Sequence, residues 1–268
     1  MKKYLSLLKY EFKTIFKSSM SVFMLLYPVL MLFITGFILP AVLEKTTSAN
    51  SNATTITLLI GFVLTLSMGG FLMGAMLGFS LIENKDENTL INIATTPVTV
   101  SGYTTFKVIY TTILAFFANL VLIGGLKLIA SNKYIIVFMG NTIRLLDRIS
   151  IGQMLIFAVV ASLVVPMIAL VIGAIAKNKV EGFAFMKSSG IIIMIPLLAL
   201  LNTFQDWKQY LLGIVPNFWA VKALLNLVLD SQDSSNLSFN MYMVIGGIIT
   251  LIIGYISFRF FVRKSNLK

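Results

Sequence analysis

The chain has 268 residues, of which 58% are hydrophobic and only 12% are charged; soluble domains carry about a quarter charged residues, so a soluble protein is excluded. The formal net charge is +11, but the basic residues lie beside long apolar runs, which indicates membrane orientation and not nucleic-acid binding. The sequence contains neither cysteine nor histidine, so disulfides, thiolate metal sites and histidine bases are excluded.

Residues 1–19 are predicted to form an interfacial helix. Apolar side chains recur at helical spacing between residues 4 and 17, while Lys9, Lys13 and Lys17 recur every four residues on another face. This pattern is typical of a helix in the inner leaflet, with its lysines toward anionic lipid headgroups.

Six apolar segments are long enough to cross a bilayer, which takes about 20 residues. They are residues 20–43, 57–82, 106–130, 151–176, 183–204 and 241–262. Pro28, Pro166 and Pro196 interrupt three of them, and neighbouring helices can satisfy the backbone groups that a proline frees. The sequence therefore predicts an all-α integral membrane protein with one transmembrane domain, residues 1–268.

The lysines and arginines divide unequally between the two sides of these spans. Fourteen fall on the side of the N-terminus and seven on the other, so both termini are predicted to be cytoplasmic, with the chain a multi-pass protein of the cell membrane. Lysine, asparagine and isoleucine usage hints at a bacterium.

Two segments outside the membrane are amphipathic. Residues 133–148 place Ile143, Leu145 and Leu146 among basic residues, which predicts a helix lying on the outer surface. Residues 205–230 are predicted to form outer amphipathic helices that are re-entrant in part. Their aromatic residues are expected in an interfacial belt, and Pro216 is expected in the first turn of the second helix.

A polar segment at residues 83–97 separates the second and third spans. Three carboxylates, those of Glu83, Asp86 and Glu87, precede a short apolar stretch, and Pro97 disfavours helix at the residue before it. The pattern predicts a cytoplasmic helix of two turns or fewer with an uncovered apolar face. A solvated loop is the alternative that the spacing leaves open.

Gly70, Gly74 and Gly78 recur every four residues in the second span. Such a stripe lets helices approach closely. The favoured interpretation is packing against another span of this chain; the alternative is a contact that changes during gating.

The chain lacks the groups that would power transport or catalysis. None of its ten carboxylates lies in the middle of a predicted span, which argues against proton- or sodium-coupled carriage without excluding a sodium site made of carbonyls. No histidine or paired acid is available to an intramembrane enzyme, and no G-x-x-x-x-G-K-[ST] loop can bind nucleotide.

Three motifs in this order resemble the permease subunits of type-2 ABC exporters. The first is the acidic cluster followed by Thr-Leu and Thr-Thr-Pro-Val after the second span; Asn88 departs from it, because the family often has glycine there. The second runs from Lys177 to Gly182, followed by Lys187 and Pro196, and the third from Pro216 to Lys222.

The resemblance implies roles for the residues of these motifs. Residues 83–97 would be the coupling helix that docks on an ATPase, with Asp86, Glu87, Thr89, Leu90, Ile91, Ile93, Thr96 and Pro97 as its coupling residues. The cytoplasmic loop motif would comprise Lys179, Glu181, Gly182 and Lys187, and the outer re-entrant segment would include Pro216, Trp219 and Lys222.

The partners and cofactors follow from the same resemblance. It implies cytoplasmic ABC ATPase subunits, a second permease that is a copy or a homologue, and the lipid bilayer. No cofactor is expected in this chain, since ATP and Mg²⁺ would bind the ATPase. The expected function is that of a non-enzymatic permease exporting amphipathic or hydrophobic cargo, such as a peptide, lipid or drug. A stand-alone channel or ion-driven carrier, or a non-transporting subunit of an exporter, are the alternatives.

Overall fold

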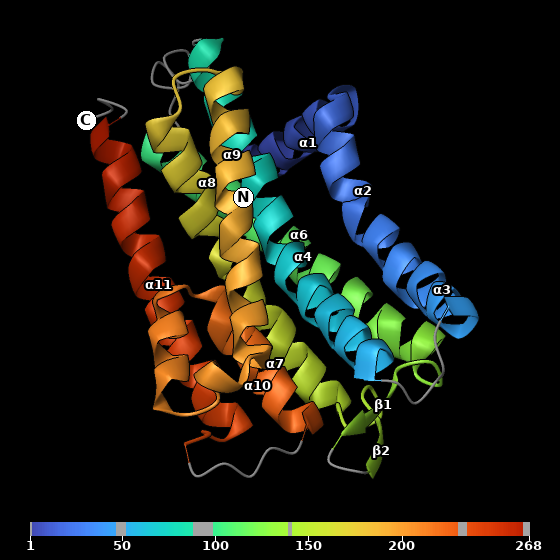
Figure 1. The fold of residues 1–268 in the computed structure, drawn as a ribbon. Helices are drawn as coiled ribbons and strands as arrows, with labels where there is room; N and C mark the ends of the chain where they lie inside the picture. The colour runs from blue at the N-terminus through green and yellow to red at the C-terminus, as the bar shows by residue number, and fades with distance from the viewer. Residues whose placement is uncertain (1, 47–51, 88–98, 139–140, 230–234, 265–268) are drawn as a thin grey trace.

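The computed structural model describes residues 2–46, 52–87, 99–138, 141–229 and 235–264. It is an all-α membrane fold with one small hairpin (Figure 1). The first half comprises α1 (Lys2–Lys17), α2 (Ser19–Phe33), the π-helical turn η1 (Ile34–Ile38), α3 (Leu39–Thr46), α4 (Asn52–Asp86), α6 (Val100–Ala130), β1 (Ile135–Phe138) and β2 (Asn141–Arg144). The second half comprises α7 (Ile151–Ser162), α8 (Val164–Ile175), α9 (Lys179–Met194), the 3-10 segments η2 (Ile195–Leu200), η3 (Asn202–Phe204) and η4 (Trp207–Ile214), α10 (Asn217–Leu229) and α11 (Phe239–Lys264).

Among the described residues, six helices are long and apolar enough to cross a membrane, which confirms the predicted number of spans. They are Ser19–Thr46, Asn52–Asp86, Ser101–Ala130, Ile151–Ile175, Lys179–Leu200 and Phe239–Lys264. The N-terminal helix is also present, as α1.

The prolines mark the irregular points of these spans. Pro166 has no N–H to donate to the carbonyl of Ser162, and the fourth span breaks there into α7 and α8 at Leu163. Pro196 lies at the start of η2, where the fifth span changes from α-helix to 3-10 helix. Pro28, by contrast, lies within the continuous helix α2.

Helix α4 forms the centre of the bundle. Its most apolar window is 72% buried, against 22% for the first span and 17% for the fifth. In Figure 1, α2 and α11 lie at opposite edges of the molecule with α4 between them; α2 packs on α4, α4 on α8, and α8 on α11. Movement of α4 would therefore be felt by most of the other spans.

The predicted outer helix at residues 133–148 is wrong. Strands β1 and β2 pair antiparallel from Ile135 opposite Arg144 to Phe138 opposite Asn141. The run Ile-Ile-Val-Phe of β1 favours a strand, and Ile136 pairs with Ile143, both of them buried. The apolar residues interpreted as a helix face include Leu145 and Leu146, which are fully buried in the turn after β2.

The segment before the last span also differs from its prediction. Its first half is the 3-10 helix η4, and only the second half, α10, is α-helical, beginning at Asn217 directly after Pro216. The aromatic residues divide: Trp207 is 64% exposed, whereas Phe218 and Trp219 are buried core residues packed beside α11. Trp207, Tyr210, Phe218 and Trp219 therefore do not all lie at the surface, as an interfacial belt would require.

Candidate functional site

The end of α4 carries the first residues of the predicted coupling segment. Glu83 and Asp86 belong to the last turn of α4, and Glu87 follows in a turn, its N–H donating to the carbonyl of Glu83 at 2.9 Å. The carboxylates of Glu83 and Asp86 therefore belong to the C-terminal end of the long helix α4. The remaining predicted coupling residues lie in 88–98, outside the described residues: Thr89, Leu90, Ile91, Ile93, Thr96 and Pro97.

The residues of the predicted cytoplasmic loop motif lie directly beside this end of α4. Lys179 Nζ is 2.7 Å from Glu83 Oε1 in a partly exposed ion pair. Gly182 lies so close to α4 that a Cβ placed there would be 2.6 Å from Ile82 Cδ1. Two motifs about a hundred residues apart in the sequence thus form one surface, formed by the end of α4 and the start of α9.

The start of α9 is held by local hydrogen bonds. Asn178 caps the helix, its side chain accepting from the N–H of Glu181 at 2.9 Å. Glu181 in turn accepts from the N–H of Lys177 at 2.8 Å. Lys187 does not join this surface; its ammonium lies 5.0 Å from the ring centre of Phe183 on the same helix. Glu181 therefore helps to hold the connection before α9, while Lys179 forms the ion pair with α4.

A buried polar cluster joins α1, α4 and α6 close to the same segment. Glu11 and Lys107 form an ion pair at 3.2 Å, with side chains only 2% and 1% exposed. Tyr103 and Tyr110 donate to the Glu11 carboxylate at 2.6 and 3.2 Å. Both charges are thus paired and hydrogen-bonded, as buried charges require.

Helix α4 supplies the remaining members of this cluster. Ser80 Oγ is 2.7 Å from Lys107 Nζ, and Asn84 Nδ2 donates to the Tyr103 hydroxyl at 3.3 Å. Asn84 lies shortly before residues 88–98 and Tyr103 shortly after them. The residues that flank 88–98 on either side are therefore tied to each other and to α1. From here on, "the polar cluster" means Glu11, Ser80, Asn84, Tyr103, Lys107 and Tyr110.

The sequence pattern does not reveal this cluster, because Glu11 lies within what its spacing predicts to be an ordinary interfacial helix. One signal was present: Leu8, Glu11 and Ile15 follow a helical spacing, so the carboxylate shares the apolar stripe of α1. The partner could not be found in the same way, because Lys107 is brought to Glu11 only by the packing of α6 against α1 and α4.

A second cation, Lys85, links the end of α4 to the last span. Its ammonium donates to the carbonyl of Gly173 in α8 and lies 5.2 Å from the ring centre of Phe261 in α11. Since the carbonyl belongs to the last turn of α8, this contact places a positive charge at the negative end of that helix.

The glycine stripe of α4 faces the fourth span of the same chain. A Cβ at Gly70 would lie 2.6 Å from the carbonyl oxygen of Ala161, and one at Gly74 would lie 3.0 Å from Ile168 Cβ. Gly78 is equally close to Ile172. The structure therefore places the stripe at an intrachain contact with α7 and α8.

The residues of the predicted outer re-entrant segment sit in the core beside α11. The Trp219 indole N–H donates to the carbonyl of Gly213 at 2.8 Å, and Gly246 of α11 lies against the Trp219 side chain. Lys222 is only 5% exposed, and Pro216 directly precedes α10. These residues fasten η4 and α10 to the last span, and Figure 1 shows α10 at the opposite end of the bundle from the start of α9.

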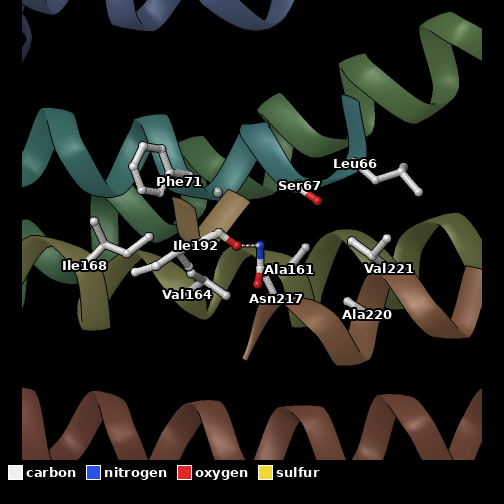
Figure 2. A pocket seen from close by; sticks show the side chains of 11 residues that line it. Leu66, Ser67, Phe71, Ala161, Val164, Ile168, Ile192, Asn217, Ala220 and Val221 are labelled. Carbon is white, nitrogen blue, oxygen red and sulfur yellow. Dashed lines mark hydrogen bonds between the residues drawn. The ribbon is translucent and has the colours of Figure 1, made fainter. Parts of the chain in front are cut away.

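A narrow pocket marks the place where α4, the α7–α8 break, α9 and α10 meet. Figure 2 shows its walls, which are apolar except for Ser67 and Asn217, and its volume is about 10 Å³. Asn217 Nδ2 donates to the carbonyl of Ile192 at 3.3 Å. Its Oδ1 atom is buried and has no hydrogen-bond partner in the part of the chain that the structure describes. Within the described residues, no group of three or more acidic side chains is placed to hold a metal ion.

Comparison with known proteins gives one consistent result. A family model described as "Fluoroquinolones export permease protein Rv2686c-like" matches residues 11–258. The chain is similar to two fluoroquinolones export permease proteins of Mycobacterium tuberculosis, from strains CDC 1551 / Oshkosh and H37Rv. Each is 25% identical over 192 residues, which are 71% of this chain and 66% of the relative, so the match spans slightly under two thirds of their length.

No solved structure matches the chain. The family match runs from α1 into α11 and so includes the first five spans, most of the sixth, the polar cluster and the Glu83–Lys179 pair. It agrees with the resemblance to exporter permeases that the three motifs indicate. The chain therefore belongs to the Rv2686c-like family of fluoroquinolones export permease proteins.

Proposed function

We propose that this chain is the membrane permease of an ATP-driven exporter, which moves amphipathic or hydrophobic cargo and is powered by separate ATPase subunits. The observation that carries this proposal is the family match over residues 11–258. The permease family indicates a transport subunit and not an enzyme, and ATP and Mg²⁺ would bind the partner. Because the relatives are named for fluoroquinolones, a drug of that class is the first cargo to test.

The structure supports a route by which an ATPase could move the spans. Residues 88–98 are flanked by two groups of contacts: the polar cluster reaches α1 and α6, and the Glu83–Lys179 pair reaches α9. A push on this segment would act on α4, which packs against most of the bundle. We propose that the segment docks on the ATPase at a cytoplasmic face, that both termini lie on this side, and that a second permease completes the transporter.

Reconstitution in lipid vesicles tests the proposal. The purified chain is compared with the chain plus its candidate ATPase, and uptake of a fluorescent fluoroquinolone is followed with and without ATP. Uptake is expected only when chain, ATPase and ATP are all present. Uptake by the chain alone would instead identify a channel or ion-driven carrier. ATP-driven uptake that does not need this chain would leave it a non-transporting subunit.

A further inference from the structure

At the break in the fifth span, a backbone carbonyl accepts a hydrogen bond from the side chain of Asn217. In a continuous α-helix, the carbonyl of Ile192 would accept a hydrogen bond from the N–H of residue 196. Residue 196 is a proline and has no N–H to donate. The donor that reaches the Ile192 carbonyl from outside the helix is Asn217 Nδ2, at the first residue of α10. Asn217 thus joins the break in the fifth span to the re-entrant segment.

The other end of the same amide is unsatisfied. Asn217 is 8% exposed, and its Oδ1 atom has no hydrogen-bond partner among the described residues. A buried acceptor left unpaired raises the free energy of the conformation that contains it. Figure 2 shows this oxygen among apolar side chains of the pocket, with the amide nitrogen toward the Ile192 carbonyl. The observed arrangement is therefore held at a cost, and a conformation that pairs Oδ1 would remove that cost.

The surroundings of Asn217 are suited to such a change. The pocket walls come from four segments, two of which are broken by proline: the α7–α8 junction before Pro166 and the α9–η2 junction before Pro196. Its volume of about 10 Å³ holds one water molecule at most. Separation of α9 from α10 would enlarge it into a cavity with apolar walls and one hydrogen-bond acceptor.

We propose that Asn217 and the Pro196 break form a latch that keeps this pocket closed. When the latch opens, Nδ2 leaves the Ile192 carbonyl, and Oδ1 becomes available to a hydrogen-bond donor on an amphipathic molecule that enters. Asn217 is a positioning residue in this account, because it acts by holding α9 against α10. The cargo side of the proposal rests on the proposed function; the latch itself does not.

The absence of cysteine from the chain allows a direct test. Ala220 lines the pocket and is 2% exposed, so Ala220→Cys reports on opening through its rate of reaction with a small methanethiosulfonate reagent. Ala115→Cys, fully buried in α6 away from the pocket, is the matched control for general loosening. Both variants are measured in lipid vesicles, without ATPase.

The latch predicts a specific pattern of labelling rates. Asn217→Ala removes the unpaired Oδ1 but leaves the Ile192 carbonyl unpaired in the closed pocket, so these two costs offset each other and the lost hydrogen bond remains. Adding Asn217→Ala to Ala220→Cys is therefore expected to raise the labelling rate about tenfold, because a hydrogen bond of ordinary strength shifts an opening equilibrium by that order. Pro196→Ala restores an N–H that can donate to the Ile192 carbonyl. The triple variant Pro196→Ala/Asn217→Ala/Ala220→Cys is therefore expected to be labelled at a rate within about twofold of that of Ala220→Cys alone.

Three outcomes would overturn the latch. The first is that Asn217→Ala leaves the labelling rate of the Ala220→Cys chain unchanged. The second is that Asn217→Ala still raises this rate when Pro196→Ala is present. The third is that Asn217→Ala raises the labelling rate of the Ala115→Cys chain by the same factor. In a separate arm with the otherwise unaltered Ala220→Cys chain, ATP-driven cycling of the ATPase is expected to raise labelling. A failure of that arm alone would count against the proposed function and leave the latch standing.

Discussion

At the scale of single residues, the most demanding feature is the buried pair of Glu11 and Lys107. Removing two charges from water costs several kcal/mol each, and the pair is stable here because both tyrosines and Ser80 supply further hydrogen bonds. A buried ion pair adds little net stability, yet it defines one geometry. We infer that it fixes how α1 docks on α4 and α6.

Truncating one partner of this pair is expected to destabilise the protein strongly. Lys107→Met leaves the Glu11 carboxylate buried without its cation, at a cost of about 3–5 kcal/mol. The double variant Glu11→Gln/Lys107→Met removes both charges and is expected to recover more than half of the loss. Thermal unfolding in detergent measures both.

The control for this experiment is Lys9→Gln, an exposed charge on the same helix, which is expected to change stability by less than about 0.5 kcal/mol. Equal destabilisation by Lys107→Met and by the double variant would show that the charges are not coupled.

The close approach of α4 to the fourth span gives a second residue-level prediction. Gly70→Ala places a methyl group against the backbone carbonyl of Ala161, which cannot move as a flexible side chain would, so a loss of about 1–3 kcal/mol is expected. Gly247→Ala in α11, where an added Cβ would have no atom of the described residues within 4 Å, is expected to be neutral or stabilising by up to about 1 kcal/mol. If denaturation midpoints fell equally for both, the close contact at Gly70 would be refuted.

At the scale of elements, the Glu83–Lys179 pair joins two connections that the sequence motifs single out. The pair is partly exposed, so its contribution to stability is expected to be below about 1 kcal/mol. Its position matters more, because it bridges the end of α4 and the start of α9 beside the predicted docking segment.

Reversing one charge of this pair is expected to impair coupling and not folding. Lys179→Glu places two carboxylates together and is expected to lower cargo-stimulated ATP hydrolysis several-fold in the reconstituted complex, with the melting temperature little changed. Glu83→Lys/Lys179→Glu restores an opposite pair and is expected to restore coupling. Lys177→Glu, exposed on the same connection, is the matched control. Failure of the swap to rescue would remove the pair from the coupling route.

The elements also show what could be predicted from the sequence. The six spans and α1 follow from apolar length and period, because lipid imposes a hydrophobic surface along each crossing. The hairpin β1–β2 was missed because a short apolar run such as Ile135–Phe138 is ambiguous between helix and strand. The burial of Trp219 and the Glu11–Lys107 pair depend on contacts between distant elements, which no local pattern contains.

At the scale of the whole molecule, the bundle has a buried centre and apolar edges. In the first, fifth and sixth spans most of the apolar window is not buried within the chain, and in a membrane this surface faces lipid or a neighbouring protein. The contacts described above connect residues 83–87 to α1, α6, α8, α9 and α11, so a single input can reach nearly every span. The central claim is that ATPase work enters this bundle through residues 86–96.

The most direct measurement is the coupling of ATP hydrolysis to cargo uptake in a variant of residues 86–96. Leu90→Asp/Ile91→Asp puts charges on its predicted apolar face, and Asn202→Asp/Thr203→Asp adds the same charges at the far end of the fifth span as a control. Both are assembled with the candidate ATPase in vesicles, and cargo uptake and ATP hydrolysis are recorded together. Our account predicts that the Leu90/Ile91 variant loses ATP-driven uptake and cargo stimulation of hydrolysis while the control keeps both. Uptake and stimulation unchanged in the Leu90/Ile91 variant would contradict it.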